Sequence, residues 1–94
     1  MKLYQVRNKE GGRGDAPVYV IRDGKFYRTV HHPSGWSETP DYEIGTDGKV
    51  YRTAHNQMGP AEAPDYEFRK DQHLYRTRFH PAGAETAPEY LLMD

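Results

Sequence analysis

The chain has 94 residues, of which 35% are hydrophobic and 29% charged, so it can form one domain with a small core. Thirteen basic and fourteen acidic side chains give a net charge of -1, which excludes a global field that would attract nucleic acid or an anionic membrane. No cysteine is present, which excludes disulfides, thiolate chemistry and cysteine-based zinc sites.

The first residues, Met1 to Gln5, contain no apolar signal segment, and no stretch approaches the roughly 18 apolar residues of a membrane helix. We therefore expect no membrane association and a cytoplasmic location. Eight tyrosines, three phenylalanines and one tryptophan predict a folded chain, because aromatic rings bury much area for their number.

The first predicted strand, residues 2–6, is half of a repeat unit whose other half lies at the end of the chain. It aligns without a gap on residues 49–53, and residues 88–92 align on residues 64–68. Three complete units lie between the halves, at approximately 17–39, 40–63 and 64–87, and residues 88–94 with 1–16 make the fourth. Every unit has one tyrosine in each of two strands. These are Tyr19, Tyr42, Tyr66 and Tyr90 in the first strands, and Tyr4, Tyr27, Tyr51 and Tyr75 in the second strands.

A short turn joins the two strands of each unit. Asp23-Gly24 and Asp47-Gly48, between β-branched and aromatic residues, are strong hairpin signals, and Asp71-Gln72 is a weaker one. A proline interrupts regular structure before each first strand, at Pro17, Pro40, Pro64 and Pro88. No helix fits between these positions, so the sequence predicts an all-β fold.

The division of the fourth unit between the two ends predicts that the first and last strands pair. Such pairing closes a ring, whereas the alternative, an open row of hairpins, leaves free sheet edges. We expect a closed pseudo-fourfold array of four two-stranded β-hairpin units, with the N- and C-terminal strands forming the fourth. It is either mini-propeller-like or a small eight-stranded barrel, depending on whether neighbouring units hydrogen-bond to each other.

The alternation of side chains along the strands suggests which residues face the interior. In the second strands, Val50 and Arg52 share one face and Tyr51 and Thr53 the other. We expect the interior to contain at least one tyrosine ring per unit together with Ile21, Ile44, Phe68 and Leu92.

Arg28, Arg52 and Arg76 recur at one repeat position, where the fourth unit has Gln5. They are candidate ligand-binding residues, because a ring of guanidinium groups can bind a carboxylate or phosphate. The structural alternative is an ion pair with Asp41, Glu43, Asp65 or Glu67 on adjoining strands, or stacking on a tyrosine.

Loops of about ten residues follow the second strands, and such loops often carry function. Trp36 is a candidate ligand-binding residue, because its counterparts Arg13, Pro60 and Ala84 show that the fold does not require an aromatic there. Its alternative role is a cap on the edge of the ring. Glycine recurs in the loops at Gly12, Gly35, Gly59 and Gly83, which predicts a backbone with positive φ.

His32 and His80 share another loop position, where the other units have Asn56 and Lys9. We include both histidines among the candidate ligand-binding residues. Two imidazoles in separate units, with no carboxylates or cysteines at ligand spacing, predict no metal site. We expect no cofactor and identify no catalytic residue.

These features favour a non-enzymatic binding or assembly module with repeated loop sites, because repeated weak sites raise avidity. The partner is unknown; a protein or glycan ligand is favoured, and the chain is a monomer or a small homo-oligomer. One alternative is nucleic-acid binding through a ring of arginines and tyrosines. The other is a small hydrolase or metalloenzyme using His32 and His80.

Overall fold

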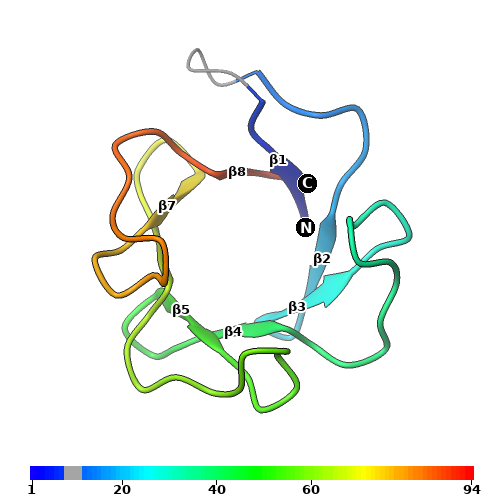
Figure 1. The fold of residues 1–94 in the computed structure, drawn as a ribbon. Helices are drawn as coiled ribbons and strands as arrows, with labels where there is room; N and C mark the ends of the chain where they lie inside the picture. Colours follow the sequence, from blue (N-terminus) through cyan, green and yellow to red (C-terminus); the bar gives the residue numbers. More distant parts are fainter. Residues whose placement is uncertain (8–11) are drawn as a thin grey trace.

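The computed structural model describes residues 1–7 and 12–94, and it contains eight short strands and no helix within these ranges. The described residues therefore contain no helix that could cross a membrane. Viewed down the axis, the strands form a ring with the connecting loops outside it (Figure 1). The strands are β1 (Lys2–Gln5), β2 (Tyr19–Arg22), β3 (Lys25–Arg28), β4 (Tyr42–Ile44), β5 (Lys49–Arg52), β6 (Tyr66–Phe68), β7 (His73–Arg76) and β8 (Tyr90–Met93).

The eight strands form one closed antiparallel barrel in which each strand pairs with its neighbours in sequence. β1 pairs with β8 from Lys2 opposite Met93 to Gln5 opposite Tyr90, so the two chain ends meet as predicted (Figure 1). The units also hydrogen-bond to each other, through β1–β2, β3–β4, β5–β6 and β7–β8. This pairing makes the fold a barrel and not a propeller, and eight strands enclose a space that side chains can just fill.

The centre of the barrel is formed by one apolar residue from each second strand. Leu3, Phe26, Val50 and Leu74 are at most 1% exposed. The expected interior residues Ile21, Ile44, Phe68 and Leu92 are partly buried and pack against this centre. They lie close to the hairpin turns, at the end of the barrel, which is why they are less completely covered.

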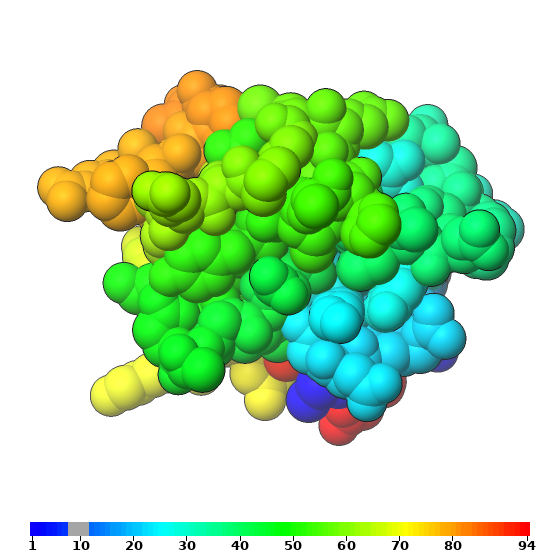
Figure 2. All heavy atoms as spheres, turned by 90° about the horizontal axis from the view of Figure 1, so that it is seen from below, coloured from blue at the N-terminus to red at the C-terminus, as the bar shows by residue number. Residues whose placement is uncertain are grey.

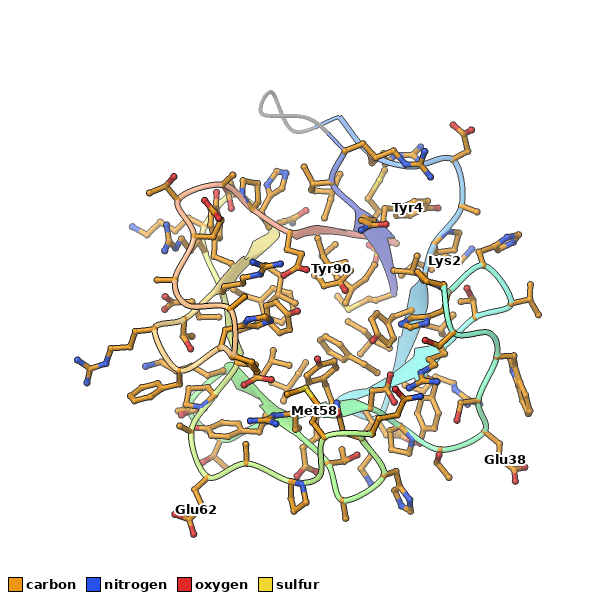
Figure 3. The ribbon with its side chains drawn as sticks, in the orientation of Figure 1. Lys2, Tyr4, Glu38, Met58, Glu62 and Tyr90 are labelled. Atoms are coloured by element: carbon orange, nitrogen blue, oxygen red, sulfur yellow. The ribbon has the colours of Figure 1, made fainter. Side chains whose placement is uncertain are left out.

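The first-strand tyrosines form a closed ring of edge-to-face contacts inside the barrel. Each ring contacts the next at a centroid distance of 5.5–6.1 Å and an interplanar angle of 72–81°. This geometry places the positive edge of one ring against the negative face of the next. Figure 3 shows Tyr90 directed into the interior. One ring per unit is therefore internal, as the repeat predicted.

The hairpin turns differ by one residue between units. In the first unit Asp23 and Gly24 both have positive φ, of 52° and 73°, which is a two-residue type I′ turn. In the second unit Gly45 N–H donates to Lys49 O across a longer turn, and only Gly48 has positive φ. The third unit has the same turn, with Gln72 at φ 63° in place of the glycine.

The ten-residue loops lie at the opposite end from the hairpin turns and the termini (Figure 2). In the first loop the Thr29 hydroxyl donates to Pro17 O at 2.6 Å and accepts from His31 N–H at 3.1 Å. Gly35, Gly59 and Gly83 have φ of 79–84°, which confirms the predicted positive φ at these three positions. Lys9, the counterpart of His32 in the fourth unit, lies outside the described residues.

Candidate functional site

The repeated arginines lie at the loop end of the barrel, where they form ion pairs with the following unit. Nitrogen–oxygen distances are 2.7 Å for Arg28–Asp41, 3.1 Å for Arg52–Asp65 and 2.8 Å for Arg76–Glu89. The ion-pair alternative considered from the sequence is therefore present, with Glu89 as a partner that the sequence had not suggested.

The fourth unit lacks both partners of this ion pair at once. Gln5 replaces the arginine, and Val18 occupies the position of Asp41, Asp65 and Glu89. A buried charge without its partner destabilises the fold, so the two members of a structural ion pair are expected to be present together or absent together. The fourth unit, which lacks both, fits this expectation. The three arginines thus have a structural partner without any ligand.

His32 and His80 hold the loops onto the hydroxyl groups of the internal tyrosines. The Nδ1 atom of His32 accepts the Ser34 N–H at 3.0 Å, so its proton is on Nε2, which donates to Tyr19 Oη at 3.1 Å. The Tyr19 hydroxyl then donates to Asp41 Oδ2 at 3.1 Å. His80 repeats the arrangement with Ala82 N–H and Tyr66 Oη.

Asn56 occupies the same loop position in the second unit and makes comparable contacts. Its Oδ1 accepts the Met58 N–H at 3.0 Å, and its Nδ2 donates to Asp41 O at 3.1 Å. An amide can therefore replace the imidazole at this position. This equivalence indicates that His32 and His80 position the loops and do not form one site together.

Burial determines the protonation states in this region. It lowers the pKa of His32 and of His80, with the neighbouring arginines adding to the effect. It raises the pKa of Tyr19, Tyr66 and Tyr90, so the phenols stay protonated at neutral pH. Among the described residues no three histidines or carboxylates gather in a way that could hold a metal ion.

The outer surface of the barrel carries three equivalent grooves, one beside the second strand of each complete unit. Their volumes are about 440, 470 and 370 Å³ for the first, second and third units. In each unit the groove is lined by the repeated Arg-Thr pair and the residue after it. The residue at the Trp36 position also contributes to each, as Trp36, Pro60 and Ala84.

The groove of the first unit contains the most exposed aromatic surface. Trp36 is 63% exposed and Val30 72%, and both line the groove with Tyr27. The face of Tyr27 is covered by the guanidinium group of Arg22, 4.3 Å from the ring centroid. Trp36 therefore provides a free aromatic face, and the structure places it in a groove instead of over the end of the barrel.

Basic side chains gather in the three grooves although the chain as a whole is slightly acidic. Eight basic residues and two acidic residues line them. The basic residues are Arg22, Lys25, Arg28, Lys49, Arg52, Arg69, Arg76 and Arg78, and the acidic residues are Glu43 and Glu67. Other acidic residues of these loops, such as Glu38 and Glu62, point away from the barrel (Figure 3).

These grooves were not predicted from the sequence. The feature of the sequence that could have revealed them is the variation between units at two repeat positions. One position has Arg22, Gly45 and Arg69, and the other has Val30, Ala54 and Arg78. No protein-family model, curated protein or solved structure matches this chain.

Proposed function

We propose that this protein is a non-enzymatic glycan-binding module whose sites are the outer grooves of its repeat units. The observation that supports this most directly is the exposed indole of Trp36 in one of three equivalent grooves. The repeat preserves the frame of each groove and varies the residues that line it. Such a division is expected where a rigid scaffold presents binding loops.

A sugar ring fits the chemistry of the first groove. The flat face of Trp36 and the side chain of Val30 offer apolar surface to the C–H face of a pyranose, while Arg22 is a polar neighbour for its hydroxyl groups. Pockets that combine an aromatic face with a few polar groups are typical of small-ligand sites.

The closed barrel argues against a protein ligand that adds a strand. Each of the eight described strands is hydrogen-bonded on both sides, so none of them offers the free edge that strand addition needs. A protein partner would have to dock through side chains alone. The grooves are smaller than the surface that a stable protein complex buries.

The aromatic surface also argues against a single-stranded nucleic acid. The outer faces of Tyr4, Tyr27 and Tyr75 are covered by Arg13, Arg22 and Arg69, at 3.9–4.3 Å from the ring centroids. Bases need a series of free aromatic faces along a continuous basic track. The exposed aromatic side chains of the grooves, Trp36 and Phe79, belong to separate units, and Arg78 lies over one face of Phe79.

The test is binding to a printed glycan array, followed by titration of the protein with each hit while the fluorescence of Trp36 is recorded. We expect at least one hit, and we expect Trp36→Ala to weaken it by about fivefold or more. Because Ala84 occupies the equivalent position in the third unit, the variant should keep the native fold, checked by circular dichroism. Pro60→Ala, which changes the same position in the second unit without removing an aromatic, is the matched control.

Absence of any array hit, or equal affinity of the wild type and Trp36→Ala for every hit, would contradict the proposal. Equal loss with Pro60→Ala would show that the loop frame and not the indole is responsible, and would also count against it.

A further inference from the structure

We propose that the grooves of the first and third units select acidic sugars, carrying a uronate or a sulfate group, and that the groove of the second unit does not. This inference rests on the glycan-binding function proposed above and adds to it the class of sugar. It depends on the charges that remain in each groove after the ion pairs of the barrel are taken into account.

Two outward positions determine the charge of each groove. At the first, Arg22 and Arg69 correspond to Gly45, and at the second, Arg78 corresponds to Val30 and Ala54. The second unit therefore has no arginine at either position. Arg22 and Arg78 are both exposed, and Arg69 has 49% of its side chain exposed.

The remaining basic residues of the grooves have acidic neighbours. Arg28, Arg52 and Arg76 pair with carboxylates of the following unit at 2.7–3.1 Å. Lys25 lies opposite Glu43 on the adjacent strand, and Lys49 lies opposite Glu67. The second groove is thereby neutral, because Lys25 and Glu43 both line it.

The first and third grooves keep a positive charge. In the first, Arg22 is present and no acidic residue lines the groove. In the third, Arg69 and Arg78 are present in addition to Lys49 and Glu67. Arg69 Nη2 lies 3.7 Å from Glu67 Oε1. In the third groove the carboxylate of Glu67 cannot balance Lys49, Arg69 and Arg78 together. Both grooves therefore complement an anion.

Each of these arginines is stacked on an aromatic ring. The guanidinium carbon lies 4.3 Å from the Tyr27 centroid for Arg22, and 4.8 Å from the Phe79 centroid for Arg78. Stacking covers the face of a guanidinium group but leaves its N–H edge free for a carboxylate or sulfate, which it binds with two parallel hydrogen bonds. It also holds the cation in place, which reduces the entropy lost on binding.

Both grooves contain an exposed aromatic beside the cation, Trp36 in the first and Phe79 in the third, which is 48% exposed. An acidic sugar would place its ring on Trp36, or on the face of Phe79 opposite Arg78, and its acid group on the arginine. The net charge of the chain is -1, so the preference would come from these local groups and would weaken as salt is added.

The experiment uses two matched pairs of ligands and ¹⁵N amide spectra of the full chain. The first pair is tetragalacturonate and its fully methyl-esterified form; the second is a sulfated galactan tetrasaccharide and its desulfated form. We expect at least one acidic ligand to bind about fivefold more tightly than its neutral partner, with shifts in the first and third units and not in the second. The two pairs distinguish carboxylate from sulfate.

Variants assign the effect to the arginines. Arg22→Gln should remove the acid preference in the first groove only, and Arg78→Gln in the third groove only. Arg22→Lys keeps the charge and should retain most of the preference. Lys70→Gln, an exposed residue outside the three grooves, is the control for net charge and should change nothing.

Equal affinity for both members of each pair would overturn the acidic-sugar inference and leave the glycan proposal standing. Failure of both acidic ligands to bind, while neutral glycans from the array do, would have the same meaning. Equal shifts of the same amides with a single-stranded oligonucleotide of matched charge would show a general anion site and would also overturn it. Failure of every glycan, on the array and in solution, would reject the proposed function itself.

Discussion

The Nε atom of Arg28 donates to Oδ2 of Asp41 across 2.7 Å, and this bond connects the second strand of one unit to the first strand of the next. The ion pair recurs between the second and third units, as Arg52–Asp65, and between the third and fourth, as Arg76–Glu89. It is absent only where Gln5 meets Val18, at the junction of the fourth unit with the first. The repeat thus encodes contacts between units as well as within them.

Removal of one partner of this pair should destabilise the barrel more than removal of both. Arg28→Gln leaves the Asp41 carboxylate buried without its cationic partner, and we expect it to cost about 3 kcal/mol in free energy of unfolding. The double variant Arg28→Gln with Asp41→Val copies the fourth unit and should be more stable than the single variant. Urea unfolding of Arg28→Gln, Asp41→Val and the double variant measures the change in free energy of unfolding for each. A change in the double variant equal to the sum of the two single changes would contradict the prediction.

The two loop histidines should make the stability of the protein depend on pH. Burial lowers the pKa of His32 and His80 below the 6.5 of an unfolded histidine, so the unfolded chain binds protons first as the pH falls. Their contribution to stability is present above pH 6.5 and is lost progressively as the pH falls from there through the folded pKa. Arg28, Tyr19 and Asp41 face His32, while Arg76, Arg52, Tyr66, Glu89 and Asp65 face His80.

The measurement is the free energy of unfolding between pH 8 and pH 5 for the wild type and for His32→Asn with His80→Asn. Asparagine is the matched replacement, because Asn56 makes the corresponding contacts in the second unit. We expect the double variant to lose less stability over this range. The same slope in both proteins would assign the pH dependence to the carboxylates.

The turn of the third unit should become more stable when its strained residue is replaced. Gln72 has φ 63°, in a backbone region that residues other than glycine adopt at a cost in energy. The equivalent residue of the second unit is Gly48, at φ 79°. We expect Gln72→Gly to raise the free energy of unfolding by about 1 kcal/mol. Gly48→Gln is the reciprocal control and should lower it by a similar amount; a gain from both would be inconsistent with this explanation.

The two chain ends should be joinable without disturbing the barrel. Lys2 pairs with Met93 in the same register as Lys25 with Arg22, so Asp94 and Met1 occupy the positions of Asp23 and Gly24. A chain in which Asp94 is joined to Lys2 through one glycine, and which is opened between Asp23 and Gly24, should fold with a stability within about 1 kcal/mol of the parent. Thermal unfolding and size-exclusion chromatography test this, and an unfolded or domain-swapped product would oppose it.

A tryptophan in the third groove should strengthen glycan binding there. Ala84 corresponds to Trp36, and its exposed position can accept a larger side chain. We expect Ala84→Trp to raise the affinity of that groove several-fold for any glycan that binds at Trp36. Ala84→Leu adds apolar area without a flat aromatic face and should give little gain; equal gains from the two variants would argue against stacking.

Local patterns were sufficient to predict the strands, the turns and the closure of the ring. Asp23-Gly24 forms its two-residue turn because both residues tolerate positive φ, a property that belongs to the residues themselves. The split fourth unit predicted the pairing of β1 with β8, since the halves align on the two strands of a complete hairpin. Sequence alternation also placed Val50 and Arg52 on one face.

The sequence alone therefore determined the repeat, the all-β class and the meeting of the termini, because these depend on neighbours along the chain. Only the tertiary structure distinguished a barrel from a propeller and showed that Arg28 faces Asp41 instead of solvent. Only it placed Trp36 and Arg22 in one groove. These outcomes depend on hydrogen bonding between units, which sets the register of strands about fifteen residues apart, and no short-range pattern encodes that register.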